Sequence, residues 1–139
     1  MPGAANTTAT VVPCLRYQDA AAAIDWLCRA FGFEKKLVVP GPTGGVAHAE
    51  LAFGNGMIMV GSAGGPYDAL VAPPGKNGGV CTQTAYLIVA DPDAHYRGAV
   101  AAGAAVVTAL EDKGHGGRGY ACRDPEGNLW NVGSYDPWA

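Results

Sequence analysis

The chain has 139 residues, of which nine are Lys or Arg and twelve are Asp or Glu, so its formal net charge is −3. This balance provides no basic surface for nucleic acid, and no apolar run reaches the roughly 20 residues that a membrane span needs. The first ten residues are polar and small, without the charged start and apolar centre of a signal sequence. We therefore expect a cytoplasmic protein whose partners are neither nucleic acids nor membranes.

The first half of the chain predicts one strand, one helix and three further strands. An apolar strand at 12–16 is followed by a helix over 19–33, whose large apolar residues recur at helical spacing and which ends at Gly32. Residues 39–45, rich in Gly and Pro, are typical of a hairpin tip. Residues 46–62 read as a strand, a Gly/Asn turn and a strand.

The second half repeats this pattern. Val-Gly-Ser occurs at 60–62 and again at 132–134, an offset of 72 residues that also brings the helix at 19–33 over an Ala-rich segment at 91–105. We expect an α+β fold of two strand–helix–strand–strand–strand modules, 10–63 and 82–135, joined by a Gly/Pro-rich bridge at 64–81.

Two motifs indicate a family. Residues 123–130 read Arg-Asp-Pro-Glu-Gly-Asn-Leu-Trp, a turn flanked by strands, and residues 47–51 read Ala-His-Ala-Glu-Leu, followed by Gly-Asn-Gly-Met-Ile-Met at 54–59. Together with the repeat, they resemble the vicinal oxygen chelate superfamily, which includes glyoxalase I, extradiol dioxygenases and bleomycin resistance proteins. Within it, the sequence looks like the PhnB-like branch. The resemblance covers about residues 10–135 and implies a single domain whose two βαβββ modules form a U-shaped cup for a small ligand, in a homodimer.

The resemblance also implies where a metal would be held. Metal-dependent members carry a His or a carboxylate on the first and last strand of each module, and these positions fall here on Val12, Met59, Thr84 and Asn131. None is a histidine or a carboxylate, so this set would hold a hard or borderline divalent metal poorly. We therefore expect no metal cofactor.

Strand alternation predicts which side chains line the cup. We expect His48 and Tyr120 to occupy equivalent places, because the offset of 72 relates them. An inward Arg16 on a central strand would need an acidic partner or an anionic ligand, although a surface-facing strand end is an equal alternative. The predicted ligand-binding residues are Arg16, His48, Glu50, Met59, Thr84, Tyr86, Tyr120 and Asn131.

The histidines differ in what they suggest. His48 is the best catalytic candidate, since Glu50 lies two residues along the same strand face and would orient its ring, although an ordinary hydrogen-bonded sheet histidine is the commoner case. His95, in the first turn of the second helix, is expected to be solvated. His115, between glycines, is expected to be a loop residue, with a lid residue as the alternative.

Several residues are expected to be structural. Trp26 and Trp130 should pack in the core, and Arg123 with Asp124 should fix the closing turn. The isolated cysteines are expected to be buried thiols rather than disulfide partners. They are Cys14, Cys28, Cys81 and Cys122.

Two functions follow from the sequence. The first is metal-free binding of a small, planar or aromatic compound, as in bleomycin resistance proteins. The second is an enzyme of the lyase, isomerase or dioxygenase type, with metal ligands relocated to residues such as His48, Glu50 and His115, or with acid/base catalysis by His48 and Tyr120. The missing ligands favour binding, and the His48–Glu50 spacing favours catalysis.

Overall fold

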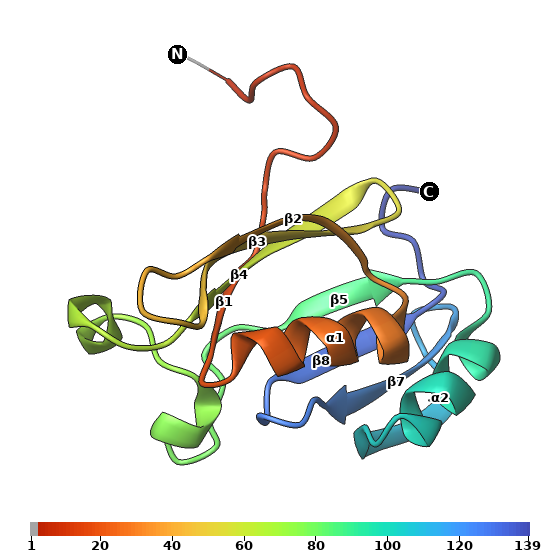
Figure 1. Ribbon diagram of the computed structural model, residues 1–139. Coiled ribbons are helices and arrows are strands. Elements are labelled where there is room, and N and C mark those ends of the chain that lie inside the picture. Colours follow the sequence, from red (N-terminus) through yellow and green to blue (C-terminus); the bar gives the residue numbers. More distant parts are fainter. Residues whose placement is uncertain (1–2) are drawn as a thin grey trace. The chain divides into compact units, whose positions relative to one another are not determined.

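The computed structural model describes residues 3–139 and contains two βαβββ repeats (Figure 1). The first repeat comprises β1 (Cys14–Tyr17), α1 (Ala20–Phe31), β2 (Glu34–Pro40), β3 (Val46–Phe53) and β4 (Gly56–Ser62). The second comprises β5 (Ala85–Ile88), α2 (Pro92–Ala101), β6 (Ala105–Asp112), β7 (Arg118–Arg123) and β8 (Leu129–Gly133). Between them, η1 (Pro66–Ala69) and η2 (Pro74–Lys76) are short 3₁₀ turns. The predicted fold class is confirmed.

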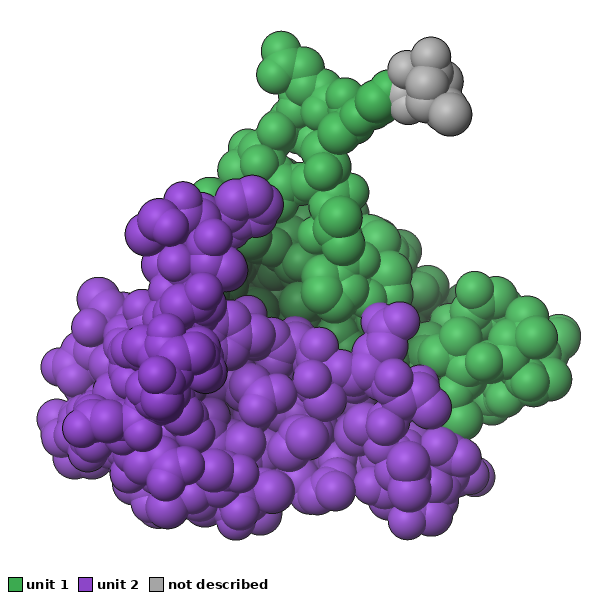
Figure 2. Space-filling view, turned by 180° about the vertical axis from the view of Figure 1, so that it is seen from behind, with its two compact units in different colours: residues 1–28, 32–72 green, residues 29–31, 73–139 purple. Residues whose placement is uncertain are grey.

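The chain divides into two compact units, coloured separately in Figure 2. The first unit contains the described residues up to Cys28 together with Gly32–Ala72, and the second contains Arg29–Phe31 and Pro73–Ala139. The last turn of α1 therefore belongs to the second unit, and the boundary at Ala72 falls within the predicted bridge.

Each unit holds one four-stranded mixed sheet with the same strand order. The orders are β1-β4-β3-β2 and β5-β8-β7-β6, with the first pair of each parallel and the others antiparallel. Cys14 pairs with Met59 and Tyr86 pairs with Asn131, so the offset of 72 holds for the two parallel pairs. β1 lies at a sheet edge, which corrects the expectation that Arg16 lies on a central strand.

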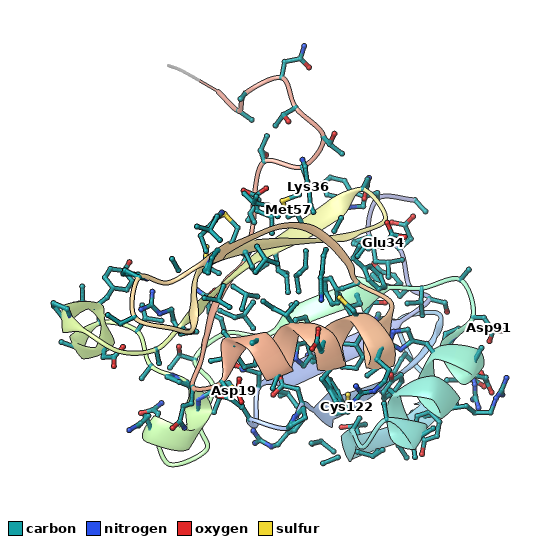
Figure 3. All side chains as sticks on the ribbon, in the orientation of Figure 1. Asp19, Glu34, Lys36, Met57, Asp91 and Cys122 are labelled. Atoms are coloured by element: carbon teal, nitrogen blue, oxygen red, sulfur yellow. The ribbon has the colours of Figure 1, made fainter. Side chains whose placement is uncertain are left out.

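Each helix begins after an aspartate, Asp19 before α1 and Asp91 before α2 (Figure 3). Asp19 accepts a hydrogen bond from the backbone N–H of Ala22 and Asp91 from that of Ala94, both at 3.1 Å. A side-chain oxygen at this position satisfies one of the backbone donors that a helix start leaves open. α1 ends at Gly32, whose φ of 91° is in the left-handed region that favours glycine.

One face of each sheet is buried and the other is accessible. In the first unit Ala49, Leu51 and Val60 are buried. In the second, α2 packs against β6 and β7, with the Tyr96 ring against that of buried Tyr120. Because side chains alternate along a strand, the residues between these buried ones lie on the accessible face. The predicted core positions of Trp26 and Trp130 are confirmed, since both are buried.

The closing turn after β7 is built around a buried carboxylate. Asp124 Oδ1 accepts from the backbone N–H groups of Glu126 and Asn128, and Oδ2 accepts from Trp130 Nε1, each at 3.0 Å. Arg123 donates to the backbone oxygens of Gly127 and Gly79. The prediction that Arg123 and Asp124 fix this turn is confirmed.

The cysteines are less uniform than predicted. Cys122 is buried and Cys28 and Cys81 are partly buried, but Cys14 is exposed, so the prediction is wrong for Cys14. Its position on the accessible face of an edge strand is the reason. Burial raises the pKa of the Cys28 thiol and raises that of Cys122 to about 12. All four cysteines are free thiols.

Candidate functional site

Four of the predicted ligand-binding residues share the accessible face of the first sheet. Met59 on β4 pairs with Cys14 on one side and with Glu50 on the other, so these three side chains form a row across the sheet. His48 lies two residues from Glu50 on β3, and Arg16 lies two residues from Cys14 on β1. Strand periodicity therefore brings Arg16, His48, Glu50 and Met59 onto one face.

His48 and Glu50 form a pair on this face. His48 Nε2 lies 2.9 Å from Glu50 Oε2, and the two side chains are 41% and 26% exposed. A carboxylate at this distance fixes the orientation of the imidazole ring. The predicted contact between His48 and Glu50 is thus present.

The second unit carries a pocket on the accessible face of its sheet. It encloses about 340 Å³, near the lower end of the roughly 300–1,000 Å³ found for ligand pockets. Its walls come from β5, β6, β7 and β8, from the loop after β6, and from the segment after β8. The lining residues are Tyr86, Thr108, Lys113, His115, Gly116, Arg118, Gly119, Tyr120, Ala121, Asn131, Val132, Gly133 and Tyr135.

Glycines keep the floor of this pocket low. Gly119 on β7 pairs with Gly133 on β8. A Cβ on Gly133 would lie only 2.9 Å from the Tyr86 hydroxyl, and one on Gly119 would collide with the carbonyl oxygen of Val132. Any side chain here would therefore require the surrounding strands or Tyr86 to move, and the space above the two strands depends on glycine.

Aromatic side chains form the rim. The Tyr86 hydroxyl donates to the backbone oxygen of Tyr135 at 2.8 Å, and the His115 and Tyr135 rings meet edge to face with centroids 4.8 Å apart. Burial raises the pKa of Tyr86, so its hydroxyl is protonated at neutral pH. Three rings and few free charges suit a planar, partly apolar ligand.

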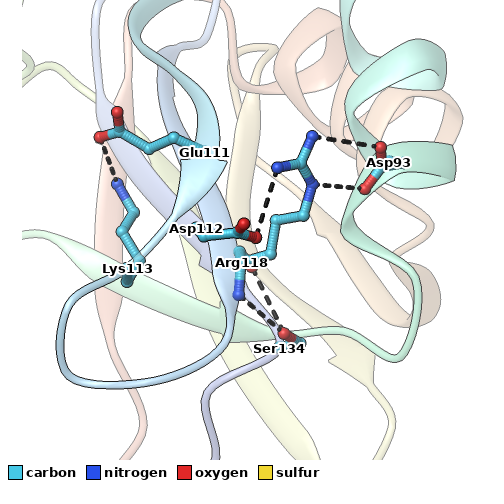
Figure 4. Close-up of polar contacts among 6 residues, drawn as sticks. All are labelled: Asp93, Glu111, Asp112, Lys113, Arg118 and Ser134. Atoms are coloured by element: carbon cyan, nitrogen blue, oxygen red, sulfur yellow. Dashed lines mark hydrogen bonds and ion pairs between the residues drawn. The ribbon is translucent and has the colours of Figure 1, made fainter.

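The loop that carries His115 is tied down at its base, as Figure 4 shows. Arg118 Nε donates to Asp93 Oδ1 at 2.9 Å, and Arg118 Nη1 donates to Asp112 Oδ1 at 3.4 Å. Its backbone N–H donates to the Ser134 hydroxyl at 3.0 Å, and Lys113 pairs with Glu111. The hydrogen bond with Asp93 raises the pKa of Arg118. Both cations at this edge of the pocket are therefore already paired.

Thr84 and Asn131 lie together in the second unit. Asn131 Nδ2 donates to the Thr84 hydroxyl at 3.2 Å. Val12 and Thr84 both precede their strands, and Met59 and Asn131 lie within β4 and β8. Within residues 3–139 there is no cluster of three or more His, Cys, Asp or Glu side chains that could hold a metal ion. The apolar side chain, thioether, hydroxyl and amide at these four positions fit a divalent cation poorly.

The predicted equivalence of His48 and Tyr120 is wrong by one residue. Val60 pairs with Ala49, whereas its equivalent Val132 pairs with Tyr120. The cause is the longer closing turn, which places five residues between the paired Arg123 and Leu129, against four between the paired Ala52 and Met57. Because side chains alternate, Tyr120 lies on the buried face, and Gly119 takes the place that corresponds to His48.

His95 is engaged rather than solvated, which corrects the expectation from sequence. Its Nδ1 lies 2.7 Å from the Tyr120 hydroxyl, and its Nε2 lies 3.0 Å from the backbone oxygen of Phe31. A carbonyl oxygen only accepts, so Nε2 carries the proton and Nδ1 accepts from Tyr120. Burial lowers the pKa of His95 and raises that of Tyr120, so both are neutral at pH 7.

Sequence reasoning missed much of the pocket. It placed Tyr86 and Asn131 there, but not Tyr135, Thr108, Gly119 or Gly133, and it treated His115 as loop. Tyr120 also contributes to the lining, although its side chain lies on the buried face. The signal that could have found Gly119 and Gly133 is the presence of two glycines in strand positions of β7 and β8, since glycine inside a strand marks a close approach or an open space.

The fold is that of a known family. Residues 7–132 match the family model of the Glyoxalase/Bleomycin resistance protein/Dioxygenase superfamily. The chain therefore belongs to this superfamily. No helix within residues 3–139 is long and apolar enough to cross a membrane.

Individual relatives agree with this assignment. TioX from Micromonospora sp. ML1 is 39% identical, with a TM-score of 0.71 and coverage of 88% of this chain and 95% of TioX. An uncharacterized protein of Mycobacterium bovis is 37% identical over 94% of this chain and 86% of its own length. The bleomycin-binding protein of Streptomyces verticillus, solved with copper(II)-bleomycin, is 22% identical over 91% of this chain and 95% of its own, with a TM-score of 0.62, and supports the fold.

Proposed function

We propose that the chain is a small-molecule-binding member of its superfamily that works without a metal ion. The observation that carries this proposal is the pocket of the second unit, with its glycine floor and a rim formed by Tyr86, His115 and Tyr135. A volume of about 340 Å³ accommodates a small compound or one planar portion of a larger one. The bleomycin-binding protein of Streptomyces verticillus has the same fold and binds a small molecule, which supports this class of function.

The electrostatics favour a ligand that is held mainly by its apolar face. Arg118 and Lys113 are engaged by Asp93, Asp112 and Glu111, so they offer little unpaired charge to a ligand. Asn131, Thr108 and the Tyr86 hydroxyl remain as neutral polar groups at the wall. Such a mixture of aromatic surface with a few neutral hydrogen-bonding groups is the usual composition of a ligand pocket.

A second candidate function rests on the His48–Glu50 pair. A carboxylate 2.9 Å from a partly exposed imidazole is an arrangement that general bases use. On this alternative the chain is a metal-free acid/base enzyme of the lyase or isomerase type. Tyr120 does not serve as the acid, because its hydroxyl is buried and bound to His95.

Three narrower expectations from the sequence stay predictions: membership of the PhnB-like branch, a homodimer and a cytoplasmic location. The U-shaped cup between the two modules also stays a prediction. Light scattering on the purified chain tests the dimer directly.

The proposed function is tested by screening planar aromatic compounds, with bleomycin included, by saturation-transfer NMR. For the strongest binder, removing one aromatic ring contact in Tyr86→Ala or Tyr135→Ala should weaken affinity about 3- to 10-fold, the equivalent of roughly 0.5–1.5 kcal/mol for a ring contact. Trp138→Ala, which removes a ring that is 90% exposed and outside the pocket, is the matched control. Equal effects of the three variants, or no binder at all, would contradict the proposal.

A further inference from the structure

Among residues 3–139, Arg16 is a cation without an acidic partner. Its guanidinium carbon lies 5.3 Å from the centroid of the Tyr67 ring, and its Nε is buried without a hydrogen-bond partner among residues 3–139. None of the ion pairs of the described residues includes Arg16. Because no carboxylate neutralises this guanidinium, an anionic ligand could form charge-assisted hydrogen bonds with it.

A glycine lies next to this guanidinium. Gly61 on β4 pairs with Arg16, and a Cβ built on Gly61 would lie 3.9 Å from Arg16 Nη1, with no other side-chain atom among its nearest neighbours. In the second unit the equivalent Gly133 is covered by the Tyr86 hydroxyl, 2.9 Å from such a Cβ. The second unit therefore places a tyrosine hydroxyl over its glycine, whereas the three atoms nearest to the same point in the first unit are Arg16 Nη1 and two backbone oxygens.

The surrounding groups select the kind of anion. One arginine supplies a planar pair of N–H donors, which matches the two oxygens of a carboxylate. Glu50 lies on the same face and is bound to His48, so its negative charge opposes a dianion such as phosphate more than a singly charged group. Tyr67, which is 55% exposed, provides an apolar surface beside the cation.

We propose that Arg16, Gly61 and Tyr67 form a subsite for the carboxylate of a small aromatic or planar acid. The guanidinium binds the two carboxylate oxygens, Gly61 leaves room for them, and the Tyr67 ring contacts the body of the ligand. This subsite lies entirely within the first unit, so it stands independently of the pocket in the second.

The test is an NMR titration of the full, ¹⁵N-labelled chain with sodium benzoate, following the side-chain Nε–Hε signal of Arg16 and the amide of Gly61. The Arg16 signal is assigned by its absence in Arg16→Met. Benzamide serves as the uncharged probe of the same shape, and inorganic phosphate as the alternative anion. We expect a saturable shift with benzoate, at least tenfold weaker binding of benzamide, and weaker binding of phosphate than of benzoate.

Two variants separate binding from folding. Arg16→Met removes the charge, and Gly61→Val fills the space while leaving Arg16 in place; its Cβ would be no closer than 3.4 Å to any neighbouring atom. Each should weaken benzoate binding at least tenfold in a chain whose amide spectrum remains folded. Arg97→Met, which removes an exposed arginine from α2, should leave it unchanged. An unsaturable benzoate shift, equal binding of benzamide, tighter binding of phosphate, or undiminished binding by Gly61→Val would overturn the proposal.

Discussion

The hydrogen-bonded pair His95–Tyr120 provides the sharpest test of how the second unit is held together. In His95→Ala the Tyr120 hydroxyl loses its acceptor at 2.7 Å and the Phe31 carbonyl loses its donor at 3.0 Å. Tyr120 is 2% exposed, so its hydroxyl would be left in a buried site without a partner. The Phe31 ring also loses the stacked imidazole, whose centroid is 5.4 Å away.

The size of the effect follows from these contacts. The lost hydrogen bond to Phe31 contributes about 1 kcal/mol, and the unpaired buried hydroxyl of Tyr120 costs about 1–3 kcal/mol. The lost ring contact adds about 0.5–1 kcal/mol to the loss of stability, and the higher helix propensity of alanine reduces the loss by up to about 0.7 kcal/mol. Because His95 is only partly buried, the lower part of this range applies, and we expect a loss of about 2–3 kcal/mol in the free energy of unfolding.

Urea denaturation followed by circular dichroism measures this loss. With a slope of about 2 kcal/mol/M, the midpoint should fall by about 1 M without a change in slope. In a double-mutant cycle with Tyr120→Phe, the two residues should couple by at least about 1 kcal/mol. Arg97→Ala, on the exposed side of the same helix, should change stability by less than about 0.5 kcal/mol. A loss below about 0.5 kcal/mol in His95→Ala, or no coupling, would refute the reasoning.

Three further predictions follow from the same structure. Burial lowers the pKa of His95 in the folded chain, so the unfolded chain binds the proton more readily. The stability that neutral His95 contributes should therefore be complete above about pH 6.5 and decline as the pH falls from there through the lowered folded pKa. In a pH series of urea midpoints, His95→Gln should flatten this decline. Asp124→Ala should lower the free energy of unfolding by about 3–5 kcal/mol, because it removes the carboxylate that accepts from two backbone N–H groups and from the buried Trp130 indole N–H. Asp124→Asn should lose less, and equal losses in thermal denaturation would contradict this. Alkylation by iodoacetamide at pH 8, followed by mass spectrometry, compares the cysteines. Exposed Cys14 should react first, and buried Cys122, with its pKa of about 12, should react only after unfolding. Early labelling of Cys122 would contradict its burial.

The sequence predicted the repeat because its signals are local. Asp19 and Asp91 each accept a hydrogen bond from the backbone N–H three residues later, and Gly32 ends α1 with a positive φ. These helix boundaries therefore do not depend on distant contacts. Asp124 likewise bonds within its own turn. Strand alternation then placed His48 and Glu50 on one face correctly.

The errors arose where long-range register or packing decides the outcome. One extra residue in the turn at 124–128 reverses the face of Tyr120, and an offset taken from Val-Gly-Ser, which lies after that turn, does not reveal it. His95 is polar and lies in a first helical turn, but its partners Tyr120 and Phe31 are 25 and 64 residues away in sequence. Tyr135 reaches the pocket from beyond the last strand, where strand periodicity makes no prediction.

The central claim is that the second unit binds a small planar molecule without a metal ion. Isothermal titration calorimetry of the strongest aromatic binder tests it most directly, with the chain first depleted by EDTA and then resupplied with zinc, nickel, manganese or iron. We predict the same dissociation constant in every case, and a weaker one in Tyr86→Ala. Binding that disappears on depletion and returns with one metal, or that is unaffected by Tyr86→Ala, would contradict the account.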